Sequence, residues 1–439
     1  MAEQVNPPDP QMIPEFQTRR KAFLVGTQTP GVTHAALEDS LTELADLAVS
    51  MGFEVCGRLS QTIRGIHPAT FLGSGKVEEL KDQAKNRQAD LVIFDNNLSP
   101  TQGENLEAAL KVMVLDRTQL ILEIFHKNAR THESRIQVEL AQLEYMLPRL
   151  VGMWAHLDRE RGGISGTKGT GEKQINIDRG IIRARISRLK KELAHISRER
   201  DTQKKRRAKN CLLVSLVGYT NAGKSTLMNR LTKATVKVED RLFATLDSTT
   251  RVLMGEKRPM VLLSDTVGFI QRLPHQLVAS FRSTLEVVRD ADLLLHVVDV
   301  SHPDFQAHIQ TTESVLNDFD GLIIPRILVF NKVDRVEDKV QLMLLKKNHP
   351  DGLFMSVLTD DLQPMVDRIA TFFEKQMVTT PLFLAYQDSR GLSEVYRWGR
   401  VDEVRYEEDG IHLRVTSTPA NIERLRSLVH LDEESTRHN

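Results

Sequence analysis

Residues 218–225 read Gly-Tyr-Thr-Asn-Ala-Gly-Lys-Ser, with the two glycines and the Lys-Ser pair of a phosphate-binding loop. The glycines allow a tight turn whose backbone N–H groups face an anion. The ammonium group of Lys224 would reach the β- and γ-phosphates of a nucleotide, and the hydroxyl of Ser225 suits Mg²⁺. A strand-like apolar run at 211–217 and a helix-like run from Thr226 supply the context that this loop requires. The pattern therefore predicts chemistry on a nucleotide phosphate.

A second segment indicates which base is bound. Residues 331–334 read Asn-Lys-Val-Asp and follow an apolar strand. The carboxylate of Asp334 can accept both N–H donors of guanine, whereas adenine would leave it unpaired at a cost of roughly 1–3 kcal/mol. Lys332 can lay its aliphatic stem over the base. Ser356 and Val357 follow the next strand, and a backbone N–H there could face the guanine oxygen. These features predict GTP and GDP as the ligands.

The end of a third apolar strand supplies candidates for contact with the metal and with the γ-phosphate. Asp265 ends an apolar run, and Gly268 follows three residues later. We expect Asp265 to hold Mg²⁺ through water and the Gly268 N–H to meet the γ-phosphate. A hydroxyl-rich segment lies where the first switch loop of a GTPase belongs. Its Thr245 is the candidate for the second Mg²⁺ hydroxyl, although spacing alone does not separate it from Thr249 and Thr250.

The predicted site is the sum of these motifs. The residues expected to contact GTP are Gly218, Tyr219, Thr220, Asn221, Ala222, Gly223, Lys224, Ser225, Thr226, Phe243, Ala244, Thr245, Leu246, Asp247, Asp265, Thr266, Val267, Gly268, Asn331, Lys332, Val333, Asp334, Ser356 and Val357. The candidates for catalysis are Lys224, Thr245 and Gly268, and those for the metal are Ser225 and Thr245. The expected reaction is hydrolysis of the γ-phosphate by positioning and charge stabilisation.

Composition bounds the class of protein. The 439 residues suggest roughly three domains. The 59 basic and 59 acidic residues balance, so net charge indicates no partner. The two cysteines, Cys56 and Cys211, argue against a disulfide framework and favour a reducing compartment. Residues 1–20 contain four prolines and no apolar core, so they predict a flexible tail rather than a signal or anchor. We expect a cytoplasmic monomer without integral membrane association, with peripheral membrane contact left open.

The pattern of strands and helices predicts a multidomain α/β protein. A small α/β domain with a parallel sheet is expected first, then a helical arm, a P-loop GTPase domain and a small α+β domain built on a hairpin. The predicted bounds are 21–130, 131–210, 211–378 and 379–439. Within the first domain, helices are predicted over 37–51, 75–89 and 105–110, and a further helix is predicted to end at about Lys127. Gly73-Ser-Gly-Lys lacks the earlier glycine of a phosphate loop, so it predicts a loop-to-helix turn and not a second nucleotide site.

The predicted arm combines two apolar seams with a strong basic excess. Heptad-like spacing occurs over 132–150 and again over 180–200, which predicts an antiparallel coiled-coil pair. A glycine-rich loop at 151–176 would join the two helices. From Arg179 to Lys209 there are thirteen basic and three acidic residues, an excess of 13 − 3 = +10. Such an excess favours contact with a nucleic-acid backbone, and without interleaved aromatic residues it does not indicate single-strand stacking.

The order of these motifs resembles the HflX family of ribosome-associated GTPases. The likeness runs from about residue 22 to 430 and includes Thr-His-Glu-Ser-Arg-Ile-Gln-Val-Glu-Leu at 131–140, Phe-Ala-Thr-Leu-Asp at 243–247 and Asp-Thr-Val-Gly-Phe at 265–269. The resemblance implies Mg²⁺ at Ser225 and Thr245. It also implies binding to the large ribosomal subunit and its RNA, rather than DNA, with GTP-dependent splitting or rescue of stalled ribosomes. The arm would then reach toward ribosomal RNA.

Two other functions fit the same residues. The nucleotide state could gate a protein partner, which would make the chain a regulatory binding module. Alternatively, the chain could be an ATP- or GTP-dependent RNA remodeller acting through its N-terminal domain. The guanine motif at 331–334 opposes ATP as the ligand of the phosphate loop, and the basic segment favours the ribosomal function.

The residue after Gly268 generates a first prediction. Many hydrolytic GTPases place a water-orienting glutamine there, whereas this chain has Phe269. We expect slow hydrolysis of GTP by the isolated protein and acceleration by a partner. A single-turnover assay at saturating GTP measures this rate, and fast hydrolysis without a partner would contradict the expectation.

Overall fold

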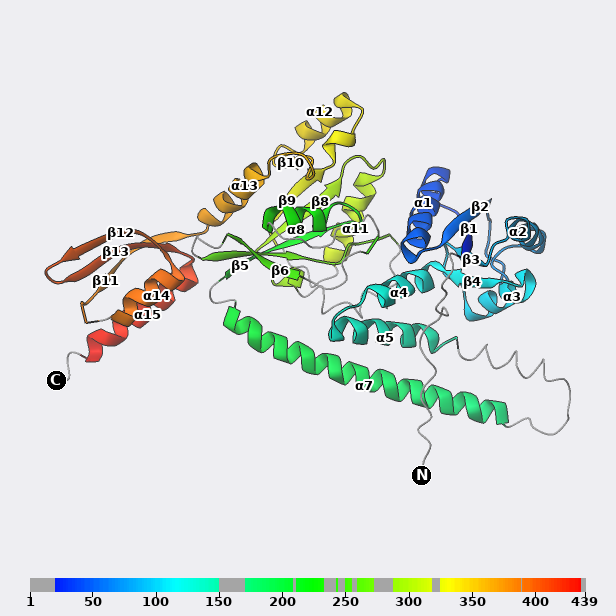
Figure 1. Ribbon diagram of the computed structural model, residues 1–439, viewed down its shortest axis with the longest axis horizontal. Helices are drawn as coiled ribbons and strands as arrows, with labels where there is room; N and C mark the ends of the chain where they lie inside the picture. The colour runs from blue at the N-terminus through cyan, green and yellow to red at the C-terminus, as the bar shows by residue number, and fades with distance from the viewer. Residues whose placement is uncertain are drawn as a thin grey trace. The chain divides into compact units, whose positions relative to one another are not determined.

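The computed structural model describes residues 20–149, 170–207, 211–232, 242–243, 249–254, 259–271, 287–317, 324–387 and 389–435 (Figure 1). The chain divides into two compact units. The first comprises Met1–Ser197 with the segments Glu239–Asp247 and Arg272–Ser283, and the second comprises the remaining residues. Each unit has its own sheets and hydrophobic clusters.

A four-stranded parallel sheet is the centre of the first unit, in the order β2-β1-β3-β4. Strand β3 reads Leu-Val-Ile-Phe and is buried throughout, as expected for a parallel strand covered on both faces. The strands are β1 (Lys21–Gln28), β2 (Glu54–Thr62), β3 (Leu91–Phe94) and β4 (Met113–Asp116). The alternating helices are α1 (His34–Met51), α2 (Ser74–Asn86), α3 (Pro100–Leu110) and α4 (Arg117–Asn128). The predicted parallel α/β sheet is confirmed.

Helix α3 begins five residues earlier than the sequence pattern predicted, at Pro100 instead of Asn105. The reason is local capping. Ser99 Oγ accepts the backbone N–H of Gln102 at 3.2 Å, and Gln102 Oε1 accepts the backbone N–H of Ser99 at 2.9 Å. This reciprocal pair satisfies two donors at the helix start, and proline is favourable in the first helical position.

A buried carboxylate, Asp116, joins the sheet to the helix that follows. Asp116 caps α4 through the backbone N–H of Gln119. It also accepts the Tyr145 hydroxyl at 2.5 Å and an Arg149 N–H at 3.0 Å. Burial raises the pKa of Asp116, and these donors oppose that effect. Since Tyr145 lies on α5 (His132–Met146), the network fixes the end of α5 to the domain core.

Helices α5 and α7 pack along the two predicted apolar seams. Figure 1 shows them side by side with opposite chain directions. Ile136, Leu140 and Leu143 of α5 form one buried cluster with Ile182 and Leu189 of α7. A bidentate ion pair between Arg185 and Glu139, at 2.7 and 2.9 Å, lies at the edge of this contact.

Helix α7 spans Thr170–Arg207, so it is 38 residues long. The predicted glycine-rich loop was therefore wrong over 170–176, where the chain is helical. A glycine in the interior of a helix lowers helix stability by about 1 kcal/mol relative to alanine. Gly171 lies in the first turn of α7 and not in its interior. The remainder of the predicted loop, 151–169, lies outside the described residues.

The second unit contains a six-stranded sheet in the order β10-β9-β8-β5-β7-β6, in which only β6 is antiparallel to its neighbour. Its strands are β5 (Cys211–Gly218), β6 (Thr249–Met254), β7 (Met260–Asp265), β8 (Leu293–Asp299), β9 (Arg326–Asn331) and β10 (Leu353–Phe354). Its helices are α8 (Lys224–Thr232), α11 (Phe305–Asn317), the short η1 (Val333–Arg335), α12 (Lys339–Asn348) and α13 (Gln363–Glu374). The carboxyl ends of β5, β7, β8 and β9 meet at one edge, where α/β sheets place their ligands.

A smaller antiparallel sheet, β11-β13-β12, follows in the same unit. It comprises β11 (Val378–Leu384), β12 (Arg400–Glu407) and β13 (Gly410–Ser417), with helices α14 (Ser389–Trp398) and α15 (Pro419–Ser435). The predicted hairpin turn at Asp409-Gly410 is present, and Gly410 has a φ of +153° that glycine adopts readily. A small α+β module at the end of the chain is confirmed.

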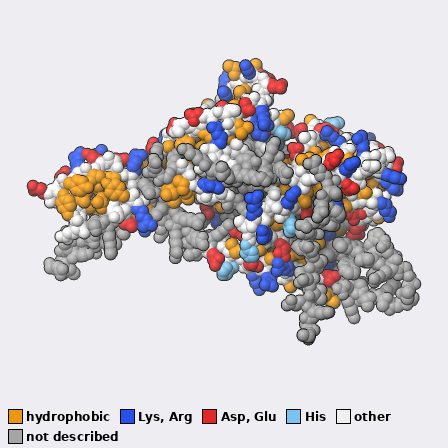
Figure 2. Space-filling view, viewed as in Figure 1, with side chains coloured by type: hydrophobic (Ala, Val, Ile, Leu, Met, Phe, Trp, Pro, Cys, Tyr) orange, Lys and Arg blue, Asp and Glu red, His pale blue; other side chains and the backbone are white. Residues whose placement is uncertain are grey.

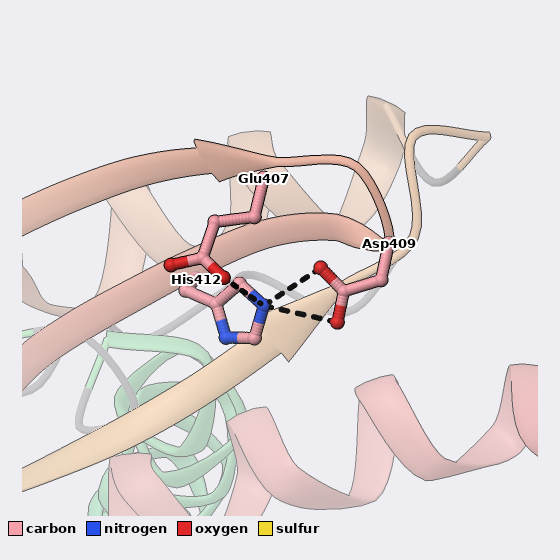
Figure 3. A group of neighbouring side chains, drawn as sticks. All are labelled: Glu407, Asp409 and His412. Atoms are coloured by element: carbon pink, nitrogen blue, oxygen red, sulfur yellow. Dashed lines mark hydrogen bonds and ion pairs between the residues drawn. The ribbon is translucent and has the colours of Figure 1, made fainter.

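The surface of this module carries both polar and apolar groups. At the hairpin, His412 Nε2 lies 3.1 Å from an Asp409 carboxylate oxygen and 3.9 Å from Glu407 (Figure 3). All three side chains are at least partly exposed. Figure 2 shows hydrophobic side chains gathered on the same module. Phe383, Tyr386 and Tyr406 of this module are exposed. The module therefore presents a mixed surface rather than a closed site.

The described helices have no membrane-spanning character. None of them combines the length and the apolar composition that crossing a bilayer requires.

One buried histidine makes the stability of the second unit depend on pH. His296 on β8 is 1 % exposed, and its Nδ1 has no hydrogen-bond partner among the described residues. Burial, together with the nearby charges of Arg326 and Lys224, lowers the pKa of His296 to about 3. The unfolded chain takes up a proton below about pH 6.5, while the folded chain does not. Stability from this residue is therefore present above about pH 6.5 and is lost as the pH falls toward 3.

We expect His296→Leu to reduce the acid sensitivity of this unit. Between pH 7 and pH 5 the native protein should lose on the order of 2 kcal/mol through His296, and the variant should not. Calorimetric unfolding at the two pH values measures the difference, with His34→Asn at an exposed position as the control. Equal pH dependence in the native protein and His296→Leu would contradict the prediction.

Candidate nucleotide-binding site

The phosphate loop joins β5 to α8 and has the conformation that its glycines permit. Gly218 and Gly223 have φ angles of +145° and +98°. A Cβ atom at Gly223 would lie 2.3 Å from the Asn331 side-chain nitrogen, and one at Gly218 would lie 2.2 Å from the Val297 carbonyl oxygen. Both positions therefore require glycine for backbone conformation and for close approach. The loop is held against the ends of β8 and β9.

Lys224 points back into this loop. Its Nζ donates hydrogen bonds to the carbonyl oxygens of Gly218 and Tyr219, at 3.0 and 2.7 Å. Burial lowers the pKa of Lys224 to about 8, and the nearby carboxylate of Asp265 partly opposes this effect. Phosphate oxygens beside the amine would favour its charged form. The amine of Lys224 thus lies against the loop that is predicted to bind phosphate.

Ser225 and Asp265 lie together, as expected for a magnesium site. The Ser225 hydroxyl donates to Asp265 Oδ2 at 2.7 Å. Asp265 ends β7 and is buried. A hydroxyl and a carboxylate are the hard oxygen ligands that Mg²⁺ prefers, directly or through its waters. These two residues fit the predicted metal.

The predicted contact of Gly268 with the γ-phosphate also has a structural basis. A Cβ atom at Gly268 would lie 2.9 Å from Thr220 Cα and 3.0 Å from Lys224 Nζ, so the backbone passes directly over the phosphate loop. Thr266 anchors the preceding turn because its hydroxyl donates to the Leu216 carbonyl oxygen at 2.6 Å. Phe269 is 3 % exposed and packs in the core, so it faces no solvent.

Asn331 connects the phosphate end of the site to the base end. Its Nδ2 donates to the Ala222 carbonyl oxygen at 2.8 Å. Its Oδ1 accepts the backbone N–H groups of Lys332 and Val357, at 2.7 and 2.9 Å. Lys332 has a φ of +62°, a conformation that this side-chain bond helps to hold. Asp334 is exposed and lies in η1.

The backbone donors near residue 356 have acceptors within the protein. The N–H of Ser356 donates to Asp360 Oδ2 at 2.8 Å, and that of Val357 donates to Asn331 as above. A guanine oxygen would have to share one of these donors. Arg230 of α8 fixes the same loop, since it donates to the carbonyl oxygens of Val357 and Asp360 at 2.7 and 2.9 Å.

Asp299 is a residue of the base site that the sequence motifs did not indicate. It ends β8, and its Oδ2 lies 2.6 Å from Lys332 Nζ, with both side chains largely buried. Its Oδ1 accepts from the Ser301 hydroxyl and N–H. The ion pair fixes the lysine stem that is predicted to cover the base. The only signal in the sequence is an acid at the end of an apolar strand, the same signal as at Asp265.

The predicted first-switch residues are only partly described. Ala244, Thr245, Leu246 and Asp247 lie outside the described residues. Phe243 belongs to the first unit, where it is 3 % exposed and its ring packs edge-on against Phe125, with centroids 4.7 Å apart. Its carbonyl oxygen accepts an Asn128 N–H at 2.8 Å. The predicted nucleotide contacts of this segment remain predictions.

Comparison with family models covers most of the chain. Residues 38–126 match a model described as GTP-binding GTPase N-terminal, and residues 128–207 match GTP-binding GTPase middle region. Residues 213–332 match a model described as 50S ribosome-binding GTPase.

Characterised relatives agree over nearly the full length. GTPase HflX of Caldanaerobacter subterraneus subsp. tengcongensis is 45 % identical over 393 residues, which are 89 % of this chain and 90 % of the relative. The chain belongs to the HflX family of GTPases. GTPase HflX of Escherichia coli strain K12 is 40 % identical over 375 residues, or 85 % of this chain and 88 % of the relative. This HflX-family chain is accordingly a GTP hydrolase, as the motifs predicted.

The chain is also similar to a solved structure, that of a GTP-binding protein from Sulfolobus solfataricus in complex with GDP. It is 23 % identical, has a TM-score of 0.44, and the alignment covers 80 % of this HflX-family chain and 98 % of the other.

The ion pair of Asp299 generates a prediction for guanine binding. Asp299→Asn keeps the side-chain shape but removes the charge that holds Lys332. Since hydrogen bonds to charged groups contribute roughly 1.5–3 kcal/mol, we expect the affinity for GDP to fall by about tenfold or more. Titration with a fluorescent GDP analogue measures this change. The matched control is Asp367→Asn on the exposed side of α13, which should bind GDP normally; native affinity in Asp299→Asn would contradict the assigned role.

Proposed function

We propose that this GTPase binds the large ribosomal subunit and couples GTP binding and hydrolysis to the splitting or rescue of stalled ribosomes. The observation that carries the proposal is a guanine site of this geometry in the same chain as a long, strongly basic helix. Relatives named GTPase HflX and the family model named for binding to the 50S subunit support the same partner.

Several of the described basic side chains of α7 lie away from the apolar seam, whereas Arg185 and Lys190 pair with acidic residues of α5. Ile182 and Leu189 are buried against α5, while Arg183, Arg188 and Lys191 are exposed. Lysine and arginine on one open face of a helix are suited to the phosphate backbone of RNA. A helix of 38 residues is about 57 Å long at 1.5 Å per residue, so such a face could follow RNA over several nucleotides.

The nucleotide site supplies the roles expected for hydrolysis. Lys224 would stabilise charge on the β- and γ-phosphates, and the Gly268 N–H would bond the γ-phosphate. Ser225, with Thr245 from the first switch, would hold Mg²⁺, and Asp265 would support it through water. When bound, the metal would supply positive charge that offsets the negative charge of the phosphates. Asp334 and Lys332 would select guanine, so that the hydrolytic cycle responds to GTP.

The other features of the proposal are the domain division and the setting. We keep the domain bounds 21–130, 131–210, 211–378 and 379–439, with α5 and α7 as an antiparallel coiled-coil arm. We also propose a cytoplasmic location, a monomer, and ribosomal RNA rather than DNA as the nucleic-acid partner.

Cosedimentation with purified ribosomal subunits tests this function. Binding to the large subunit should be stronger with a non-hydrolysable GTP analogue than with GDP, and it should weaken with salt. Charge reversal of Arg188 and Lys191 should weaken binding and reduce the slope of log affinity against log salt by about 2. The control reverses Lys339 and Lys347, two exposed lysines of α12.

Equal binding with GDP and with the GTP analogue would contradict a GTP-driven cycle on the ribosome. Equal weakening by both double variants would contradict a specific role for α7, since it would reflect net charge alone.

A further inference from the structure

Tyr219 occupies the second position of the phosphate loop, and its ring is held by α11. The ring stacks on that of His308 with centroids 3.7 Å apart and an angle of 5° between the planes. Tyr219 is 6 % exposed. The ring centroid of His302 lies 4.4 Å from that of His308. The Tyr219 ring is thus fixed by packing and is unable to turn freely toward solvent.

The hydroxyl of the same residue bonds the segment that follows Gly268. Tyr219 Oη accepts the backbone N–H of Gln271 at 2.7 Å. The backbone around Tyr219 pairs with Phe269 on both sides: Thr220 N–H donates to the Phe269 carbonyl oxygen at 2.8 Å, and Phe269 N–H donates to the Gly218 carbonyl oxygen at 3.1 Å. Residues 269–271 are therefore attached to the phosphate loop at three points.

This attachment controls the peptide that is expected to bond the γ-phosphate. Gly268 precedes the attached segment directly, and its N–H must be correctly placed when the transition state forms. Rates of such reactions depend on placement within fractions of an ångström. In this chain Phe269 lies in the core and offers no polar group, so backbone placement is more important than in a GTPase with glutamine there.

The stacked rings of Tyr219 and His308 are suited to hold the phosphate loop in one position at neutral pH. Burial, together with the neighbouring His302 and against the opposing effect of Asp299 and Asp304, lowers the pKa of His308 to about 4. At neutral pH the imidazole is uncharged, and it presents a flat ring that the phenol can cover. The pair thus behaves as an aromatic contact between α11 and the phosphate loop.

We propose that Tyr219 is a positioning residue for GTP hydrolysis, which fixes the Gly268 peptide through its hydroxyl bond to Gln271 and its ring contact with His308. It touches neither the metal nor the reacting atoms in this role. Its contribution is to the transition state, because the ground-state contacts of the phosphates come from the backbone of the loop and from Lys224. This role adds to the established GTPase activity and requires no ribosome.

Tyr219→Phe tests the proposal most directly, because it removes only the hydroxyl. Since one hydrogen bond is worth roughly 1 kcal/mol, we expect the single-turnover rate of GTP hydrolysis by the full-length protein to fall by about fivefold. The affinities for GDP and GTP should stay within about twofold of native, which a general structural defect would not allow. Tyr396→Phe, at an exposed tyrosine of α14, is the matched control and should hydrolyse GTP at the native rate.

Two variants of His308 test the ring contact. His308→Ala should slow hydrolysis by a similar factor, and His308→Phe, which restores a flat uncharged ring, should recover most of the rate. A native rate in Tyr219→Phe would overturn the proposal. So would a loss of GDP affinity equal to the loss of rate, since this would assign Tyr219 to nucleotide binding alone.

Discussion

The amide group of Asn331 is the interaction on which the nucleotide site depends. It is buried, and its three hydrogen bonds reach the phosphate loop at Ala222, the base motif at Lys332 and the following loop at Val357. An unpaired buried polar group costs roughly 1–3 kcal/mol, so removal of this amide would leave several groups unsatisfied at once. The distance between the phosphate end and the base end is consequently set by one side chain. The glycine at 223 is required for the same reason, since any larger residue would occupy the place of this amide.

The parts of this architecture that could be predicted are those encoded in short segments. Spacing alone is enough to recognise the glycines of the phosphate loop and the acids at strand ends. The same holds for the apolar seams at 136–143 and 182–189. Asp299 could not be identified in this way, because its role arises from β8 lying beside β9 in the sheet. The start of α3 depends on the reciprocal cap between Ser99 and Gln102, which apolar periodicity does not reveal, and α7 begins at Thr170 although Gly171 is a residue type common in loops. Local capping therefore determines where α3 begins, and the position of Gly171 in the first turn allows α7 to begin before it.

Phe269 illustrates how packing and catalysis share one position. Its side chain packs with Val217 and Leu294 in a hydrophobic cluster, which stabilises the segment after Gly268. Tyr219 holds the same segment from the phosphate loop. A glutamine at 269 would be free to orient water but would give up this packing. The described segment 268–271 is thus held by packing and by hydrogen bonds, with Phe269 at the position where many hydrolytic GTPases have glutamine.

The buried amine of Lys224 has a thermodynamic consequence for ligand binding. With a pKa of about 8, a sizeable fraction of this side chain is uncharged in mildly alkaline solution. Nucleotide phosphates favour the ammonium form, so binding is accompanied by uptake of a proton from the buffer. The heat of binding then includes the ionisation heat of whichever buffer is present. We therefore expect the affinity for nucleotide to decline as the pH rises above 8, because Lys224 must gain a proton for each binding event.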